Sequence, residues 1–184
     1  SAATHSHYYP LALAQLPALQ ALDDLDLPCY SAALLQTELD CFWQWFIEKF
    51  VGFKASVEQV RSYQALCQFL IDSACGQPQV VVHRDYHSRN LMCVDQRLAV
   101  IDFQDAVVGP VTYDVVSLLK DCYIRWPRSV VVAYAEAFWQ DHVDAVSWPD
   151  FLAQFDWMGL QRHLKVLGVF ARLSLRDDKH HYLP

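Results

Sequence analysis

The stretch that decides the fold reads His83-Arg84-Asp85-Tyr86-His87-Ser88-Arg89-Asn90, and Ile101-Asp102-Phe103 follows it. An apolar run at 80–82 precedes the stretch, and two further apolar runs at 91–94 and 98–101 separate it from the second motif. This pattern predicts a buried strand, a polar loop, a short hairpin and an acidic strand end. We therefore expect the side chains of Asp85, Asn90 and Asp102 to surround one point.

These three side chains supply the groups that phosphoryl transfer requires. Asp85 could accept the proton of an attacking hydroxyl, and the oxygens of Asn90 and Asp102 could hold Mg²⁺ beside a nucleotide phosphate. Each residue taken singly is also a common turn former or strand-end cap. Their joint occurrence in this order, each after an apolar strand, favours a phosphotransferase centre.

Five neighbouring residues have weaker assignments. His83 is expected to brace the loop by hydrogen bonding, and His87 either touches the transferred phosphate or is a solvated loop residue. Arg89 either neutralises phosphate charge or forms a salt bridge. Asp105 either binds substrate or caps the following turn. Asp114 either caps the helix that it opens or holds the catalytic loop through hydrogen bonds.

Composition narrows the class of protein. The 184 residues, 54% of them apolar, are enough for one domain with a real core. A net charge of −7, from 14 basic and 21 acidic side chains, argues against nucleic-acid binding. The sequence shows no basic amphipathic cluster, no transmembrane-length apolar run and no signal peptide, so we expect no membrane role and a cytoplasmic location. The six Cys include no CxxC pair and are expected to be free thiols rather than zinc ligands.

The first half of the chain is predicted to be mainly helical after a poorly ordered start. Residues 1–30 contain three prolines and an acidic cluster, and predict a lead-in or linker with at most a short turn of helix. Ser31 is expected to cap a helix that runs to about Lys49. Residues 56–59 have the form of a capping box, and predict a second helix that ends at Gly76. We expect this second helix to be the central buried helix.

The second half adds the hairpin and further helices. Gly109-Pro110 predicts a turn, and Tyr113 is expected to open a third helix. Another helix is expected over 129–142. The last helix is predicted to begin at Ser147 and to be broken near Gly159. The fold class expected from these elements is α+β and mostly α-helical.

The two motifs together resemble the kinase-like phosphotransferases, the superfamily of protein kinases and of aminoglycoside and choline kinases. The block Gly109-Pro110-Val111-Thr112-Tyr113-Asp114, which follows the metal carboxylate at once, points to the aminoglycoside-phosphotransferase branch. This block and those at 83–86, 102–106 and 157–166 are similar to the bacterial anomeric sugar kinases, which phosphorylate N-acetylmuramate and N-acetylglucosamine in cell-wall recycling.

This resemblance implies a fold and a set of roles. The fold would be the C-terminal lobe of a protein-kinase-like fold, with a small β-hairpin carrying the catalytic and metal residues. Asp85 would be the base, Asn90 and Asp102 would hold Mg²⁺, and ATP would be the phosphoryl donor. The partners would be the nucleotide and a small-molecule sugar.

The family pattern is incomplete in one respect. A full member begins with an N-terminal lobe that carries a phosphate-covering loop and a phosphate-gripping Lys, and neither is recognisable before residue 83. We therefore expect residues 31–184 to form the C-terminal lobe, with the N-terminal lobe absent. Such a chain should bind ATP weakly and turn over little or nothing by itself. An exposed apolar strip should lie near the hairpin, where the absent lobe would pack.

Alternatives remain open for the substrate. Arg162, His163 and Lys165 could contact the sugar, including a carboxylate on it, or could form an ordinary polar helix face. A choline or aminoglycoside kinase belongs to the same superfamily, although this basic cluster argues against cationic substrates. A non-catalytic kinase-like binding domain is the alternative from another class, and the intact Asp85, Asn90 and Asp102 argue against it.

Overall fold

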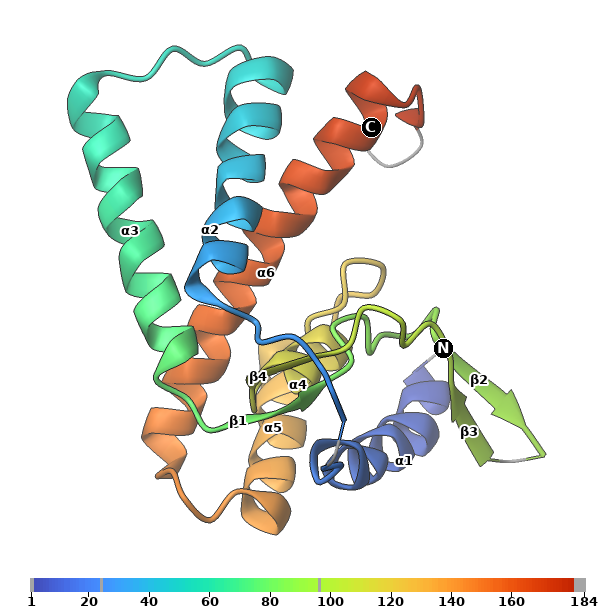
Figure 1. Ribbon diagram of the computed structural model, residues 1–184. Coiled ribbons are helices and arrows are strands. Elements are labelled where there is room, and N and C mark those ends of the chain that lie inside the picture. Colours follow the sequence, from blue (N-terminus) through green and yellow to red (C-terminus); the bar gives the residue numbers. More distant parts are fainter. Residues whose placement is uncertain (1, 24, 96, 181–184) are drawn as a thin grey trace.

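A computed structural model describes residues 2–23, 25–95 and 97–180, and shows helices arranged around a small amount of sheet (Figure 1). The elements in chain order are α1 (Ala2–Gln20), α2 (Ala32–Cys41), η1 (Phe42–Phe50), α3 (Val57–Cys75), β1 (Gln79–Val82), β2 (Leu91–Val94), β3 (Arg97–Val100), β4 (Val107–Pro110), α4 (Tyr113–Leu119), α5 (Arg128–His142) and α6 (Trp148–Arg176). The predicted α+β, mostly helical class is confirmed. Among the helices described, none is long and apolar enough to cross a membrane.

The longest helix, α6, is the element around which the others are organised. It crosses the molecule diagonally and contacts η1, α2, α3, α4 and α5 (Figure 1). Ser147 caps its start, accepting a hydrogen bond from the backbone N–H of Asp150. The predicted break near Gly159 is wrong, because the helix runs unbroken through it. The side chain of Lys120 fills the space that a Cβ at Gly159 would occupy.

The second predicted helix is present but is not the central one. Its capping box forms as expected, with Ser56 and Gln59 each bonding the other's backbone N–H. However, α3 lies at the outer side of the molecule and buries one face only, through Cys67, Leu70, Ile71 and Ala74. The prediction failed because an apolar stripe shows that a helix has a buried side, but not how many neighbours cover it.

The helix capped by Ser31 has the predicted extent but changes its geometry part-way. Ser31 accepts a hydrogen bond from the backbone N–H of Leu34, and α2 continues directly into η1, a π-helix. The change begins at Phe42, where the backbone of α6 comes closest. A Cβ built on Gly168 would lie 2.5 Å from the backbone nitrogen of Phe42.

The segment predicted to be a lead-in is a helix that belongs to the core. Tyr9, Ala12, Leu13 and Leu16 are all buried, at the spacing of one helical face. Pro10 and Pro17 lie inside this helix, α1. The prediction of a linker is therefore wrong for residues 2–20, because burial of this face outweighs the lost backbone hydrogen bonds.

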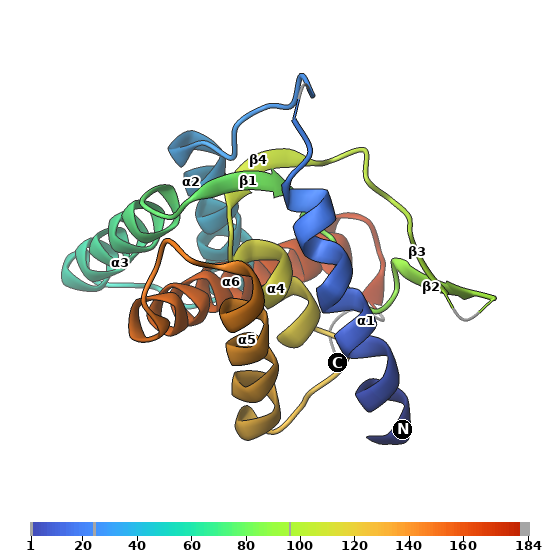
Figure 2. The ribbon, with the colours of Figure 1, turned by 90° about the horizontal axis from the view of Figure 1, so that it is seen from below.

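Side-chain hydrogen bonds attach α1 to the part of the chain that carries the two motifs. The carbonyl of Ala12 accepts from the Tyr86 hydroxyl at 2.8 Å. The side chains of Gln15 and Gln20 donate to the carbonyls of Leu98 and Val111. Figure 2 shows α1 lying beside the β2–β3 hairpin. The helix thus supports the catalytic loop and hairpin from one side.

The four strands form two separate antiparallel pairs, β1 with β4 and β2 with β3. The predicted strand at 80–82 and the predicted hairpin are confirmed. The turn predicted at Gly109-Pro110 is wrong, because both residues belong to β4. Val108 bonds the segment around Cys29 on the far side of β4, and Gly109 is needed there because a Cβ would lie 3.1 Å from Tyr30.

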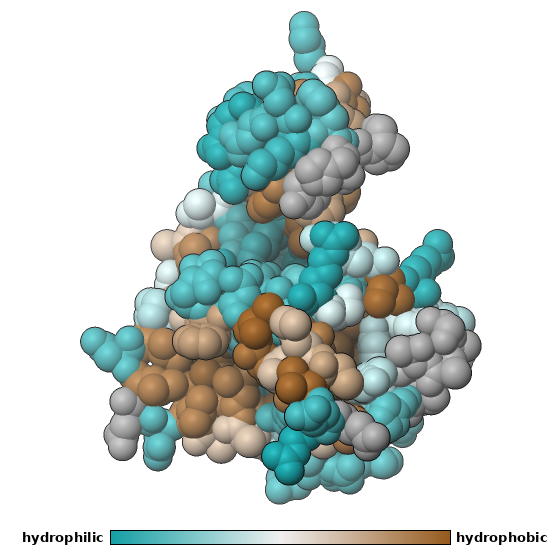
Figure 3. All heavy atoms as spheres, turned by 90° about the vertical axis from the view of Figure 1, so that its right-hand side faces the viewer, coloured by the Kyte–Doolittle hydropathy of each residue, from teal (hydrophilic) through white to brown (hydrophobic). Residues whose placement is uncertain are grey.

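The hairpin and its exit present the apolar strip that the sequence predicts. This strip consists of Met92, Val94, Ile101 and Phe103, whose exposed fractions lie between 41% and 70%. Figure 3 shows apolar atoms gathered in the lower half of the face that carries α1 and the hairpin. An exposed patch of this kind is typical of a surface that another segment or partner covers.

The contact between α6 and η1 gives a first test of the fold. Replacing Gly168 with Ala should lower the free energy of unfolding by about 1–3 kcal/mol, because the new Cβ meets backbone that can only move by separating the two helices. Gly159→Ala in the same helix is the matched control. Its Cβ meets the flexible end of Lys120, so its loss should be smaller. Urea denaturation measures both, and equal losses would contradict the close approach.

Candidate active site

The catalytic loop, residues 83–90, leaves β1 and is fixed at its start by a buried carboxylate. The Asp114 side chain accepts hydrogen bonds from the backbone N–H of His83 at 2.7 Å and of Arg84 at 3.1 Å. Asp114 lies in the first turn of α4, a helix whose residues are all buried. Of the two roles predicted for Asp114, these bonds support that of holding the loop.

The same carboxylate has an unusual protonation equilibrium. Burial raises the pKa of Asp114 to about 7, although the two backbone N–H groups and the charge of Arg162 act in the opposite direction. A group with such a pKa can be neutral or ionised near physiological pH. Its position beneath the loop makes it a structural acceptor rather than a reacting group.

Two residues of the motifs have a left-handed backbone conformation that residues other than glycine rarely adopt. Arg84 has φ 72° and Asp102 has φ 69°. Both residues are next to or part of the predicted site. Arg84 precedes the proposed base, and Asp102 is a proposed metal ligand. Such conformations persist only where surrounding contacts enforce them, and they concentrate at functional sites.

Asn90 contacts the other two central residues of the prediction, at the backbone of Asp85 and at the side chain of Asp102. The Asn90 amide nitrogen donates to the Asp85 carbonyl at 3.0 Å and reaches the Asp102 carboxylate at 3.4 Å. Gln104 donates to the other oxygen of Asp102 at 2.8 Å. The hairpin therefore returns Asp102 to the end of the catalytic loop, as the order of strands predicts.

The donor set at this point suits magnesium. One carboxylate and one carboxamide are enough for a cation that keeps several waters and takes phosphate oxygens as further ligands. Among the residues described, no group of three or more His, Cys, Asp or Glu side chains is placed to hold a metal ion. In the present arrangement the NH₂ group of the Asn90 side chain faces Asp102. For Asn90 and Asp102 to bind one cation together, the Asn90 amide must turn so that its oxygen faces Asp102.

His83 braces the hairpin against the loop, as predicted. Its Nε2 lies 3.0 Å from the Ile101 carbonyl, immediately before Asp102. Burial lowers the pKa of His83, and the nearby carboxylates only partly offset this effect. The neutral imidazole therefore acts as a fixed link between the two motifs.

His87 and Arg89 both contact Tyr123. The Arg89 guanidinium lies 3.5 Å from the centre of the Tyr123 ring, and the imidazole of His87 meets the same ring edge-on. Burial is the main reason that the pKa of His87 is lowered. Asp105 is exposed beyond the hairpin. Roles of these three toward phosphate or substrate stay predictions.

The three basic residues of α6 that were predicted to contact substrate do not form one cluster. Arg162 is buried beneath the loop, where its charge acts on Asp114. The His163 ring nitrogen bonds the Lys120 carbonyl at 3.0 Å. Lys165 binds Glu38 at 2.9 Å. Neighbouring helix positions face different directions, so each has its own surroundings. Contact with a sugar stays a prediction for each.

Glu38 is the main residue that sequence reasoning missed. Its carboxylate binds Arg84 at 2.7 Å and Lys165 at 2.9 Å, and also accepts hydrogen bonds from Tyr30 and Gln161. Burial raises the pKa of Glu38, but the charge of Lys165 and these hydrogen bonds outweigh burial and hold the pKa below its usual value. Glu38 thus joins α2 and α6 to the catalytic loop.

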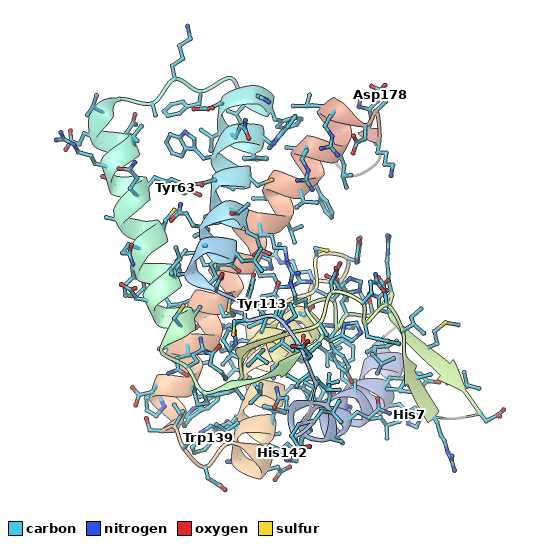
Figure 4. The ribbon with its side chains drawn as sticks, in the orientation of Figure 1. His7, Tyr63, Tyr113, Trp139, His142 and Asp178 are labelled. Atoms are coloured by element: carbon cyan, nitrogen blue, oxygen red, sulfur yellow. The ribbon has the colours of Figure 1, made fainter. Side chains whose placement is uncertain are left out.

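This network lies at the centre of the molecule. Lys165 also donates to the Tyr113 hydroxyl at 3.1 Å, and Figure 4 shows Tyr113 where the helices and the loops meet. A signal for Glu38 was present in the sequence. Glu38 is three residues from Leu35 and next to Leu39, so it borders the apolar face of its helix. A charge at that position needs buried partners.

Comparison with known proteins assigns the family. The family model described as the phosphotransferase enzyme family, APH, matches residues 3–148. The chain belongs to this family. The predicted superfamily, inferred from the two motifs, is thereby confirmed.

Curated relatives of this phosphotransferase chain are sugar kinases by name. The N-acetylmuramate/N-acetylglucosamine kinase of Pseudomonas aeruginosa is 43% identical over 178 residues, covering 94% of this chain and 53% of that protein. Proteins of the same name from Pseudomonas putida and Neisseria meningitidis serogroup B are 44% and 40% identical, covering 87% and 86% of this chain and 49% of each relative. The chain spans about half the length of the curated relatives it matches.

A solved structure supports the fold. The ADP-bound aminoglycoside phosphotransferase APH(2'')-Ib superposes with a TM-score of 0.60 at 16% identity, covering 93% of this chain and 58% of that chain. At this identity the likeness concerns the fold alone. The predicted kinase-like architecture is confirmed.

The Glu38 network predicts a specific loss of stability. Glu38→Gln should lower the free energy of unfolding by about 3–5 kcal/mol, because Arg84 and Lys165 would be left buried without their counter-charge. Glu48→Gln is the matched control, since Glu48 is exposed on the continuation of the same helix. Its effect should stay within about 0.5 kcal/mol. Chemical denaturation compares the two, and a cost for Glu38 no larger than that of the control would refute the network's importance.

The bond between His163 and the Lys120 carbonyl also predicts a pH dependence of stability. Burial lowers the pKa of His163, so the unfolded chain takes up a proton near pH 6.5 that the folded chain takes up only at lower pH. Stability from this group is complete above pH 6.5 and is lost as the pH falls toward the folded pKa, and the loss is small because the side chain is exposed to solvent.

The measurement is urea denaturation of wild type and His163→Gln between pH 7.5 and 5. The variant should lose stability less steeply with falling pH, because it lacks the group that protonates on unfolding. The values at pH 7.5 serve as the reference for each protein. Parallel slopes would show that His163 contributes nothing to this dependence.

Proposed function

We propose that the chain supplies the base and metal-binding half of a cytoplasmic, ATP- and Mg²⁺-dependent sugar kinase. The acceptor is the anomeric hydroxyl of N-acetylmuramate or N-acetylglucosamine, as in cell-wall recycling. The observation that carries this proposal is the 40–44% identity to kinases of that name over most of this chain. The family match over residues 3–148 includes the loop that carries Asp85 and Asn90 and the hairpin that leads to Asp102.

In this mechanism Asp85 orients the acceptor hydroxyl and accepts its proton as the phosphate is attacked. Asn90 and Asp102 would hold Mg²⁺, which when bound would supply positive charge to offset that of the phosphate. The guanidinium of Arg89 binds the same phosphate. Stacked on the ring of Tyr123, the guanidinium keeps its N–H groups in the plane and available to phosphate oxygens. His87 completes this side of the site.

Within the Glu38 network alone, the positive charges outnumber the carboxylate. Arg84 and Lys165 contribute two positive charges against the one carboxylate of Glu38. This excess suits a sugar that carries a carboxylate, and disfavours choline and aminoglycosides, which are cations. On the acceptor side we retain Asp105, Arg162 and His163 as candidates, together with Lys165.

The proposed enzyme needs a second half that grips ATP. Relatives extend over about twice the length of this chain. We propose that an N-terminal lobe packs on the strip of Met92, Val94, Ile101 and Phe103, next to Asp102. Residues 1–184 alone would then lack one wall of the nucleotide cleft and bind ATP weakly.

The decisive test is a kinase assay on the full-length protein that contains this chain. With ATP and Mg²⁺, the protein should phosphorylate N-acetylmuramate and N-acetylglucosamine and leave choline and an aminoglycoside unchanged. ³¹P NMR of the product should show the phosphate coupled to the anomeric proton. Residues 1–184 alone should turn over little.

Two variants connect this activity to the site. Asp85→Asn should lower kcat by about 10²–10⁴-fold, because the base is lost while the shape is kept. Asp102→Ala should abolish Mg²⁺-dependent nucleotide binding, measured by calorimetry. Phosphorylation of choline in preference to the sugars, or full activity in Asp85→Asn, would overturn the proposal.

A further inference from the structure

The segment that follows α4 touches the catalytic loop at three successive residues. It turns back toward the loop after Leu119 and continues to the start of α5 at Arg128. Its residues Asp121 and Tyr123 contact loop residues 87–89. These three loop residues lie between the proposed base, Asp85, and the proposed metal ligand, Asn90.

Asp121 uses both of its carboxylate oxygens. One oxygen accepts hydrogen bonds from the Ser88 hydroxyl at 2.6 Å and from the Ser88 backbone N–H at 3.2 Å. The other accepts from the backbone N–H of Tyr123 at 2.9 Å. Asp121 is buried. The carboxylate therefore fixes the loop and the following segment in one arrangement.

Tyr123 holds the side chains on either side of Ser88. Its ring lies 3.5 Å from the Arg89 guanidinium carbon and 5.7 Å from the centre of the His87 imidazole. A guanidinium over an aromatic face is attracted by the ring and loses rotational freedom. Both side chains that the mechanism directs toward phosphate are thus supported by one ring.

One carboxylate in the first turn of α4 and one that lies two residues past its end bind the start of the loop and Ser88. Asp114, in its first turn, accepts the N–H groups of His83 and Arg84, and Asp121, just past its last residue, accepts that of Ser88. All the residues of α4 are buried, so the separation of the two carboxylates is fixed by a rigid element.

We infer that Asp121 and Tyr123 are positioning residues for phosphoryl transfer, which set the placement of Asp85, Arg89 and Asn90 without touching the substrate. This inference rests on the proposed function. A displaced loop should lower turnover and raise the Mg²⁺ concentration that the reaction requires. Binding of the acceptor should stay almost unchanged.

The test uses the full-length protein with Asp121→Asn, Ser88→Ala and their double variant. Asp121→Asn should lower kcat by about 10–100-fold, as expected for a residue that orients a metal ligand, and should raise the Mg²⁺ concentration for half-maximal rate several-fold. KM for the acceptor should change by less than about 2-fold. Asp141→Asn, an exposed carboxylate of α5, is the control and should match wild type.

The double variant identifies the contact. If Asp121 acts through Ser88, then Ser88→Ala should cost much less in the Asp121→Asn background than in wild type. Tyr123→Phe keeps the ring and should retain more activity than Tyr123→Leu. Additive losses, an acceptor KM that rises as much as kcat falls, or an unchanged Mg²⁺ requirement would overturn the inference.

Failure of the proposed function gives a different result. If the wild-type protein phosphorylates none of the acceptors, the Mg²⁺ dependence of nucleotide binding becomes the readout. Asp121→Asn should still raise the Mg²⁺ concentration that nucleotide binding requires, compared with Asp141→Asn. The same Mg²⁺ dependence in both variants would overturn the positioning role by itself.

Discussion

The structure depends on one buried carboxylate that receives two consecutive backbone N–H groups. Asp114 accepts hydrogen bonds from the backbone N–H groups of His83 and Arg84. Arg84, whose N–H is held in this way, has a left-handed backbone conformation. The chain therefore leaves β1 in a direction that an ordinary strand end would not take. Everything that follows, from Asp85 to Asn90, is placed by that change of direction.

Arg84 is held a second time, through its side chain. Glu38 binds its guanidinium and at the same time binds Lys165 of α6. One residue of the loop is thus tied to α4 by its backbone and to α2 and α6 by its charge. A buried ion pair of this kind contributes specificity of arrangement more than stability, because desolvation offsets much of the attraction. Here it fixes the helices relative to the loop that carries the proposed base.

Hydrogen bonds hold the proposed metal ligand Asp102 from two directions. His83 bonds the carbonyl before Asp102, and Gln104 bonds its carboxylate. These contacts orient the carboxylate before any cation arrives, so little ordering remains to be done on binding. The site is therefore prepared by hydrogen bonds to its backbone and neighbours rather than by many ligands.

Some elements could be predicted because they depend on local chemistry. The capping box at Ser56, the cap at Ser31 and the hairpin after Asn90 all involve residues within a few positions of one another. The helix at 2–20 could not be predicted in the same way. Its prolines argue locally against a helix, and only burial against the loop and hairpin reverses the balance.

The sequence by itself determined the phosphotransferase family and the approach of Asn90 to Asp102, because both follow from short motifs joined by one hairpin. Only the tertiary structure decided which charges are buried together. Glu38, Arg84 and Lys165 lie far apart in the chain, and Asp121 is distant from Ser88. Their pairing depends on how the helices pack around α6, and no local pattern encodes a contact between distant segments.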